Sequence, residues 1–318
     1  MKNILITGVC GQIGTELVRK LRQEIPNARI IATDVKAPPE TVHSHASFHY
    51  LDVTNTTELA KMVGEYEIDT IYHLAALLSA TGEKNPGLAW KVNMQAFFDI
   101  LEMSRNNGVK MVIMPSSIGA FGPTTPRDDT PNLTIMRPTT MYGITKVTGE
   151  LLMEYYSKKF GLDCRSMRFP GIISSETEPG GGTTDYAVDF YYKAVEGKTA
   201  NCFVTEDTTL PFMYMPDAIN VLWELANANP DKLTTRTYNV TAFSASAKEF
   251  EEAIRKLVLT FKVTYEADYR QAIADSWPKS LDDSLAHKDW GWKPKFDLAK
   301  MSVDMIKNLR LRLTHNGD

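Results

Sequence analysis

Short continuous runs of apolar residues alternate with amphipathic stretches along the first half of the chain. The run over residues 3–7 predicts a buried strand, and the amphipathic stretch after it predicts a helix to about residue 24. Further buried strands are expected at residues 29–34, 47–51, 69–74 and 110–114. Because strand and helix alternate through residue 115, the sequence predicts an α/β fold, a Rossmann-type doubly wound parallel sheet with helices on both faces.

A glycine-rich turn joins the first expected strand to the first expected helix. Gly8 permits a tight turn, Gly11 lets the backbone approach a pyrophosphate, and Gly14 lets the helix and the strand pack closely. The phosphates would lie at the helix N-terminus, beside Gln12 and Ile13. The turn therefore predicts a dinucleotide site.

The second expected strand ends in Asp34, about 20 residues after the last glycine of the turn, where a Rossmann unit places a carboxylate on the adenosine ribose. A carboxylate there accepts hydrogen bonds from the 2′-hydroxyl and repels a 2′-phosphate, so NAD is favoured over NADP. After the strand at residues 69–74, the small side chains of Ala75 and Ala76, next to Leu74, let the backbone approach the cofactor.

The stretch over residues 141–146 carries a tyrosine and a lysine four positions apart, at the head of a helix expected to reach residue 160. Positions i and i+4 share a helix face, so Tyr142 and Lys146 would point into the same cleft. A tyrosine has a pKa of about 10, and a neighbouring ammonium stabilises the phenolate. Tyr142 could then exchange a proton with a substrate alcohol, and a hydroxyl of Ser116 or Ser117 could hold the same oxygen.

Beyond residue 174 the regular alternation ends, and a polar glycine-rich loop leads into shorter strands and further helices. Residues 1–172 are expected to form an NAD-binding Rossmann domain that also carries the catalytic serine, tyrosine and lysine. Residues 173–318 are expected to form mainly a smaller C-terminal α/β substrate-binding sub-domain, with some segments returning to the Rossmann sheet.

Composition narrows the classes of partner. The net charge of −4 gives no basic field for nucleic acid or an anionic membrane surface, so a small-molecule substrate is favoured. The sequence contains no run of about 18 apolar residues, so no membrane-spanning helix is expected. The three cysteines lack Cys-x-x-Cys spacing and fit a reducing compartment, so a cytoplasmic location is expected. His43, His45 and His49 have no carboxylate at ligand spacing, so no metal site is expected.

Together these motifs resemble the extended branch of the short-chain dehydrogenase/reductase superfamily, and the resemblance runs nearly end to end. The segments that carry it are the glycine turn at 8–14, Ser117, the Tyr-Gly-x-Thr-Lys segment at 142–146 and the Trp-Gly-Trp-Lys-Pro segment at 290–294. More narrowly, the chain resembles the short-chain type of L-threonine 3-dehydrogenase at residues 115–123, 179–186, 214–217 and 276–278.

The resemblance implies NAD-dependent oxidation of the C3 hydroxyl of L-threonine to 2-amino-3-oxobutanoate, without a metal. It implies that Tyr142 is the general base, assisted by Lys146 and Ser117, although the neighbouring Ser116 stays open as the alcohol-orienting hydroxyl. Further cofactor contacts are implied at Asp52, Val53, Tyr142, Lys146 and Pro170. Substrate contacts are expected at Ser79, Ser117, Tyr142, Thr183, Thr184 and Trp277.

Two other functions stay open. The first is a nucleotide-sugar epimerase or dehydratase, but such enzymes usually carry an arginine before the Tyr-x-x-Asp segment, where this chain has Thr-Leu-Pro-Phe-Met over residues 209–213. The second is a non-catalytic dinucleotide-binding redox sensor. Sensors of that kind commonly lose the tyrosine or the lysine, whereas this chain has both Tyr142 and Lys146.

The resemblance also implies a homodimer, because related enzymes pair through a bundle made by a helix expected here over residues 88–107 and the helix that carries Tyr142. The apolar side chains available for such a bundle are Val92, Phe97, Ile100, Leu151, Leu152 and Tyr155. The alternative is that these side chains face the protein's own sheet.

Overall fold

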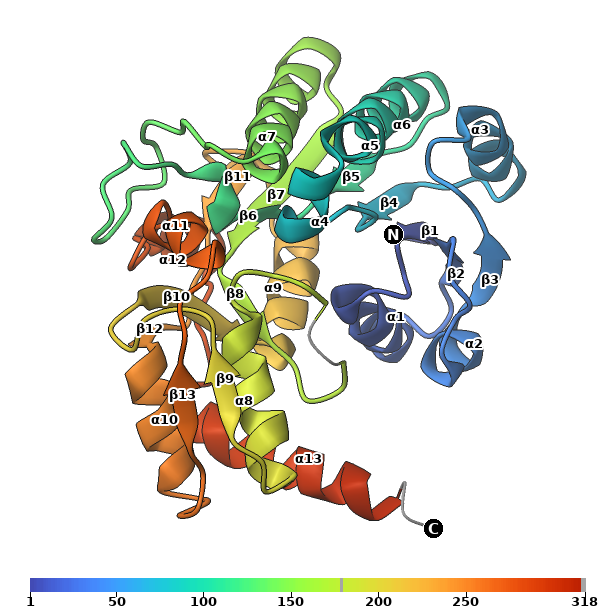
Figure 1. Cartoon of the computed structure of the whole chain (residues 1–318). Coiled ribbons are helices and arrows are strands. Elements are labelled where there is room, and N and C mark those ends of the chain that lie inside the picture. Colours follow the sequence, from blue (N-terminus) through green and yellow to red (C-terminus); the bar gives the residue numbers. More distant parts are fainter. Residues whose placement is uncertain (178–179, 316–318) are drawn as a thin grey trace.

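The computed structural model describes residues 1–177 and 180–315, and its largest element is a parallel sheet (Figure 1). Within the described residues, eight strands form this sheet in the order β11-β7-β5-β4-β1-β2-β3, with β6 paired to β7. Their bounds are β1 (Asn3–Thr7), β2 (Arg29–Asp34), β3 (Ser47–Tyr50), β4 (Thr70–His73), β5 (Met111–Ile113), β6 (Ser116–Ser117), β7 (Asp163–Phe169) and β11 (Thr237–Asn239). The strand order reverses at β1, which pairs in parallel with β2 on one side and β4 on the other. The predicted doubly wound sheet is confirmed.

Helices cover both faces of the large sheet (Figure 1). One face carries α1 (Gln12–Glu24), α2 (Glu40–His45) and α9 (Met215–Asn227), and the other carries α3 (Thr56–Glu65), α6 (Ala96–Asn106) and α7 (Met141–Phe160). On α1, Leu17, Val18 and Leu21 are buried at helical spacing and pack in one cluster with strand residues such as Ile4. Burial of these apolar stripes fixes the helices on the sheet.

A π-helical turn interrupts the helix that was expected over residues 88–107. The segment divides into α5 (Pro86–Trp90), a π turn (Lys91–Gln95) and α6. Asn93 lies in this turn, and its side chain accepts a hydrogen bond from Leu77 N at 2.7 Å and donates one to Leu77 O at 3.0 Å. The bulge aims Asn93 at the loop that follows β4. Ser79 follows this loop and opens the short helix α4 (Ser79–Lys84).

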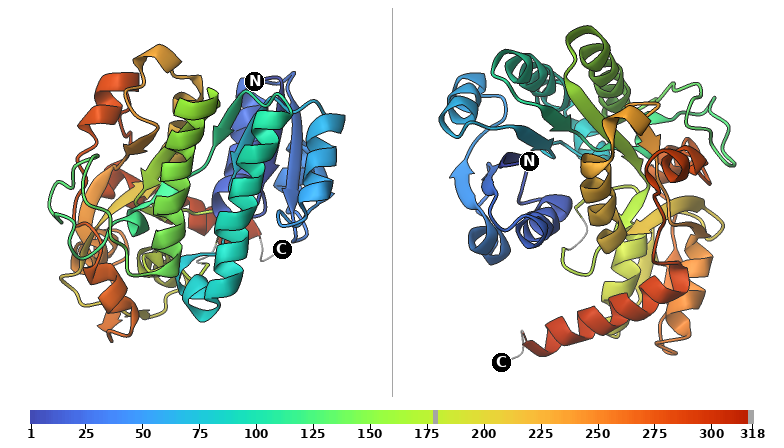
Figure 2. Two further views of the ribbon diagram at one scale, coloured as in Figure 1. Left: turned by 90° about the horizontal axis from the view of Figure 1, so that it is seen from above. Right: turned by 180° about the vertical axis from the view of Figure 1, so that it is seen from behind.

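A smaller α/β part lies beside the large sheet. Its strands form the sheet β12-β10-β8 and the pair β13-β9, with bounds β8 (Gly171–Ile173), β9 (Ala200–Cys202), β10 (Thr209–Tyr214), β12 (Phe243–Ser246) and β13 (Val263–Tyr265). Its helices are α8 (Asp185–Val195), α10 (Ala247–Arg255), α11 (Arg270–Asp275) and α13 (Leu298–His315), whereas α12 (Ser284–Trp290) packs on the large sheet beside β11. Short 3-10 turns occur at Ile118–Ala120 and Pro230–Lys232. Figure 2 shows α13 along the edge of this part that lies farthest from α6 and α7.

Two of the apolar side chains expected at a dimer interface are buried inside the protein itself. Phe97 and Ile100 have no exposed surface and pack in the cluster between α6, α7 and the large sheet. The expectation of an intersubunit role is therefore wrong for these two residues, since the π turn and α6 direct them onto the chain's own core. Leu151 and Tyr155 on α7 are exposed, at 57% and 52%. Among the described residues, none of the helices combines the length and apolar character needed to span a membrane.

A buried carboxylate joins the start of α9 to the C-terminal segment. Asp217 is fully buried and accepts backbone hydrogen bonds from Lys295 N at 3.0 Å and from Phe296 N at 3.0 Å. Burial raises the pKa of Asp217, and these two N–H donors oppose the rise. The contact holds the chain entering α13 against α9.

We expect Asp217→Asn to lower the free energy of unfolding by about 1–3 kcal/mol, because the amide NH₂ group would face backbone donors that lose their acceptor. Urea denaturation measures the change. The matched control is Asp128→Asn, at an exposed aspartate, which should stay within about 0.5 kcal/mol of the parent protein. Equal unfolding midpoints for the two variants would contradict this account of Asp217.

Candidate active site

A cavity of about 610 Å³ lies between the large sheet and the smaller α/β part. It is bordered by the segments that follow β1, β4 and β6, at the carboxyl edge of the sheet where open α/β folds bind ligands. The predicted site residues that line it are Gly8, Gly11, Gln12, Ile13, Gly14, Leu74, Ala76, Ser79, Ser117, Tyr142, Lys146, Pro170, Thr183, Thr184 and Trp277. The structure therefore brings most of the predicted catalytic, cofactor and substrate residues to one place.

Four predicted cofactor residues lie outside this lining, namely Asp34, Asp52, Val53 and Ala75. Other residues line the cavity although the sequence reasoning missed them, for example Leu77, Thr81, Phe169 and Thr177. Phe169 ends β7, so its place at the carboxyl end of a strand could have indicated it. No sequence pattern indicated Thr177, because it reaches the cavity only through the packing of its loop beside α1. Gln12 Nε2 on α1 donates a hydrogen bond to Thr177 O at 3.5 Å.

The glycine turn forms one end of the cavity. Gly8 has a φ of +71°, and a Cβ atom there would lie 2.5 Å from Ala75 N, so only glycine fits. At Gly11, an added Cβ would approach only Gly8 O, at 3.4 Å, among the described residues other than its chain neighbours, so the turn is open on that side. Among the described residues, no side chain caps the N-terminus of α1. The turn thus leaves backbone N–H groups of α1 for an anion, as a dinucleotide pyrophosphate requires.

Asp34 is held beside this turn by two backbone donors. Its carboxylate accepts hydrogen bonds from Cys10 N at 2.9 Å and from Lys36 N at 3.0 Å, and both donor residues line the cavity. The carboxylate therefore lies directly behind the cavity wall with lone pairs left over for a ribose hydroxyl. Asp52 is used locally, since its Oδ1 accepts from Thr54 N at 2.9 Å. Burial and the nearby Asp34 carboxylate raise the pKa of the Cys10 thiol to about 12, which keeps it protonated.

Tyr142 stands in the first turn of α7, and close backbone packing fixes that turn. Thr140 caps the helix by accepting a hydrogen bond from Gly143 N at 3.1 Å. A Cβ atom at Gly143 would lie 2.2 Å from Gly119 O, so glycine is needed for α7 to start against this loop. The Ser117 side chain hydrogen-bonds to Tyr142, which opposes the rise in the pKa of Tyr142 that burial causes.

Lys146 lies one helical turn further along the same face. Its Nζ atom donates a hydrogen bond to Pro115 O at 2.6 Å and lies 5.5 Å from the centre of the Tyr142 ring. Burial lowers the pKa of Lys146 to about 8, and the carboxylate of Glu150 works against that decrease. An ammonium beside a phenol favours the phenolate, so Lys146 and Ser117 both support Tyr142 as a base.

The structure separates the two serines that the sequence left as alternatives. Both serines line the cavity, but Ser116 is buried and its hydroxyl donates to Glu150 Oε1, whereas the Ser117 side chain hydrogen-bonds to Tyr142 and accepts from Gly119 N at 3.1 Å. Successive side chains of a strand point to opposite sides, which explains the division.

Another part of the cavity wall is built from α4 and the glycine-rich loop before α8. Ser79 Oγ and Thr183 Oγ1 lie 3.5 Å apart, and both side chains are nearly fully buried. Asp185 shapes the loop by accepting hydrogen bonds from Gly181 N and Gly182 N at 2.8 and 2.7 Å. Pro179, which belongs to the same motif, lies outside the described residues. The wall is polar where Ser79 and Thr183 meet and apolar at Trp277.

His73 ends β4 and lines the same cavity, but it is held in the core. Its Nδ1 atom lies 2.8 Å from Thr7 Oγ1, and its ring stacks on Phe97. Burial, assisted by the positive charge of Lys146, lowers the pKa of His73 to about 3. His73 is therefore neutral at physiological pH and serves packing.

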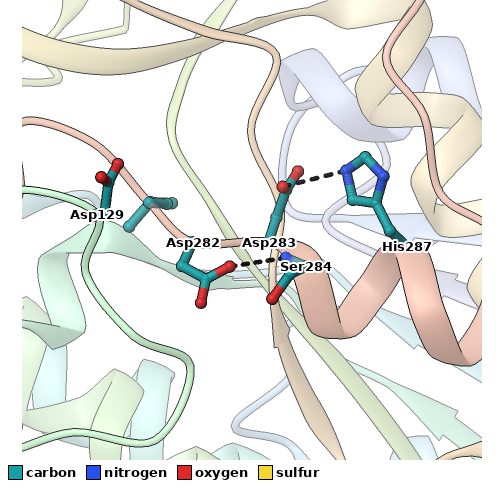
Figure 3. A pocket seen from close by; sticks show the side chains of 6 residues that line it. Asp129, Asp282, Asp283, Ser284 and His287 are labelled. Carbon is teal, nitrogen blue, oxygen red and sulfur yellow. Dashed lines mark hydrogen bonds and ion pairs between the residues drawn. The ribbon is translucent and has the colours of Figure 1, made fainter.

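A second cavity, of about 600 Å³, is lined by acidic residues at the start of α12 (Figure 3). Asp282 accepts from Ser284 N at 2.9 Å, and Asp283 lies 3.1 Å from His287 Nε2 and accepts from Trp292 Nε1 at 3.1 Å. These side chains thus secure the helix and the tryptophan. No group of three or more His, Cys, Asp or Glu residues in the described part of the chain is arranged to hold a metal ion.

Comparison with known proteins places this site in a family. Residues 4–241 match the model of the NAD dependent epimerase/dehydratase family. A curated relative, an uncharacterized epimerase/dehydratase of Staphylococcus haemolyticus, is 49% identical over 96% of this chain and 97% of its own. A GalE-like L-threonine dehydrogenase from Cupriavidus necator, solved in its holo form, is 48% identical with a TM-score of 0.93, covering 96% of this chain and 99% of its own.

A third relative bears on the oligomeric state. It is described as a monomeric L-threonine 3-dehydrogenase from a metagenome, and it is 47% identical with a TM-score of 0.93 over 98% of this chain and 99% of its own. The expected homodimer therefore gains no support from the comparison. The matches do agree on the fold and on the extended branch of the short-chain dehydrogenases that the motifs indicated. The chain belongs to the NAD-dependent epimerase/dehydratase family, and its cofactor is NAD.

Proposed function

We propose that this protein is an NAD-dependent oxidoreductase that converts L-threonine to 2-amino-3-oxobutanoate by oxidising the C3 hydroxyl. The observation that carries the proposal is the meeting of Ser117, Tyr142 and Lys146 at the floor of one cavity whose wall is made by Ser79, Thr183 and Trp277. The similarity to L-threonine dehydrogenases of other organisms supports it.

The residues present fit NAD. The open glycine turn and the uncapped N-terminus of α1 would hold the pyrophosphate, and Asp34 would accept hydrogen bonds from the adenosine ribose. Lys146 would contact the nicotinamide ribose, with Pro170 close to the nicotinamide and Asp52 and Val53 toward the adenine. When bound, NAD supplies the hydride acceptor and a positively charged ring.

Tyr142 takes the proton of the substrate alcohol. Ser117 holds the alcohol oxygen within reach of Tyr142, and its hydrogen bond to the tyrosine already favours the phenolate. Lys146 supplies the positive charge that keeps the phenolate accessible despite its burial. Hydride leaves C3 as Tyr142 accepts the proton, so the alcohol becomes a ketone.

The wall made by α4 and the loop before α8 would bind the rest of the amino acid. Hydroxyls of Ser79, Thr183 and Thr184 can donate to the carboxylate or accept from the ammonium, and Trp277 offers an apolar surface to the threonine methyl group. Recognition by neutral donors predicts modest affinity, because no charge-assisted pair with the carboxylate forms here. Residues 209–213 of β10 and the loop before this strand contain no arginine. A sugar-nucleotide substrate, whose diphosphate such an arginine would bind, is therefore disfavoured.

Tyr142→Phe should lower kcat by about 10²–10⁴-fold and leave NAD affinity within a few-fold, because it removes the proton acceptor and little else. NADH absorbance with L-threonine measures the rate, and quenching of protein fluorescence measures NAD binding. Tyr155→Phe, at an exposed tyrosine of the same helix, is the matched control. Near-parental turnover by Tyr142→Phe would exclude Tyr142 as the base.

Asp34→Ala should weaken NAD and increase the use of NADP relative to NAD, since one carboxylate both binds the ribose and repels a 2′-phosphate. The ratio of kcat/KM values for the two cofactors measures the effect. Because Asp34 also accepts from Cys10 N, Asp34→Asn serves as the control that keeps an acceptor while losing the charge. A parent protein that already preferred NADP would contradict the role of Asp34.

L-Threonine should be oxidised about ten-fold or more faster than L-serine at equal low concentration, because the missing methyl loses a contact worth roughly 1–3 kcal/mol. Trp277→Ala should reduce this preference, and Thr183→Ala should lower kcat/KM for threonine while sparing NAD binding. Steady-state rates with both amino acids check both variants. Interconversion of UDP-sugars with no oxidation of threonine would overturn the substrate while leaving the family intact.

A further inference from the structure

We infer that Glu150 is a positioning residue for the oxidation described above: its carboxylate keeps Lys146 charged and fixes the strand that presents Ser117. The expected effect on turnover rests on the proposed function, whereas the expected effect on the protonation of Lys146 does not. Glu150 does not line the cavity, so it would act through Lys146 and Ser116.

Glu150 stands on the catalytic face of α7. Tyr142, Lys146 and Glu150 are spaced four residues apart, so they form one row along the helix. Glu150 therefore follows Lys146 in this row. Its side chain is only 5% exposed, and the Lys146 ammonium beside it is also buried. Of the two outer members of the row, Tyr142 enters the cavity and Glu150 faces the protein interior.

A network of buried polar groups holds the Glu150 carboxylate in place. Arg168 on β7 contacts both of its oxygens, with Nε 3.0 Å from Oε1 and Nη2 2.8 Å from Oε2. Arg168 is also held from behind, since its Nη1 atom donates to Asn132 O at 2.7 Å and to Asn239 Oδ1 at 2.9 Å. These charge-assisted hydrogen bonds hold the Glu150 carboxylate in one position on the Lys146 side of α7.

The same carboxylate is tied to the strand that carries the alcohol-orienting serine. Ser116 Oγ donates to Glu150 Oε1, and Ser117 is the next residue of β6. Lys146 Nζ donates to the carbonyl of Pro115, the residue before Ser116. Two side chains of α7, one helical turn apart, therefore hold two consecutive residues, Pro115 and Ser116, and Ser117 is the next residue, which hydrogen-bonds to Tyr142.

The charges around Lys146 show why Glu150 matters to it. The titratable or charged groups that the structure places around the Lys146 side chain are Tyr142 and Glu150 on α7, His73 on β4, and Arg168 on β7, which lies behind Glu150. His73 is neutral at physiological pH, and Tyr142 is neutral until it loses its proton. Glu150 is thus the one permanent anion in this set, and it opposes the loss of the Lys146 proton that burial favours.

The decisive test follows the protonation of Lys146 directly, without substrate. The ¹³C signal of Lys146 Cε, assigned by its absence in Lys146→Met, is titrated in ¹³C-lysine-labelled protein and in Glu150→Gln. We expect the midpoint to fall by about one pH unit in Glu150→Gln, a ten-fold change in the proton affinity. The sign follows because removal of an anion destabilises a neighbouring cation. An unchanged midpoint overturns the inference.

Turnover gives the second readout. With saturating NAD, Glu150→Gln should lower kcat about ten-fold, and the fall of kcat/KM on the alkaline side should begin at a lower pH, as Lys146 loses its proton earlier. Ser116→Ala removes the hydrogen bond to Glu150 but keeps the Glu150 carboxylate. It should therefore lower kcat without changing the pH at which kcat/KM begins to fall. If Ser116→Ala leaves kcat unchanged, the tethering role is wrong.

A structural control separates these effects from loss of stability. Asp163→Asn breaks the pair with the buried Arg165 at the opposite end of β7, so it should lower the melting temperature without altering the Lys146 midpoint. If Glu150→Gln does not fold, Lys146 is titrated in Glu150→Asp instead. The shorter carboxylate of that variant should lower the Lys146 midpoint by a smaller amount. If the parent protein makes no NADH from threonine, the proposed function fails while the Lys146 titration still decides the inference.

Discussion

The burial of a lysine ammonium beside a tyrosine is the constraint on which the rest of this site depends. Lys146 is nearly fully buried, and burial alone favours the uncharged amine. The proposed chemistry requires the opposite, because a neighbouring cation stabilises the phenolate of Tyr142. The protein meets this requirement with a carbonyl acceptor at Pro115 and with the carboxylate of Glu150.

A charged group in the interior needs partners on every side, and this explains the polar core around α7. Glu150 needs Arg168, and Arg168 needs the carbonyl and amide oxygens of Asn132 and Asn239. Asn239 ends β11, the strand that extends the large sheet beyond β7. The support of one ammonium in the cavity thus extends to the edge of the sheet and to residues of the second half of the chain.

Close backbone packing gives the site its shape. Gly143 lets α7 begin against the loop at Gly119, and Asn93 in the π turn holds the loop after β4 through Leu77. Both contacts are made by elements that pack on the sheet, and they fix the position of the side chains that we propose to be catalytic. Another part of the cavity wall is made by α4 and the loop before α8, which come from different halves of the chain.

The sequence by itself determined the sheet, the glycine turn, the acid at residue 34 and the tyrosine and lysine row. Each of these is a local pattern, because the repeat of apolar residues reports which side chains share a face. Only the tertiary structure decided which face meets which element. It assigned Ser116 to Glu150 and Ser117 to Tyr142, turned Phe97 and Ile100 inward, and joined Ser79 to Thr183. These pairs are far apart in sequence, so their contacts depend on how whole elements pack.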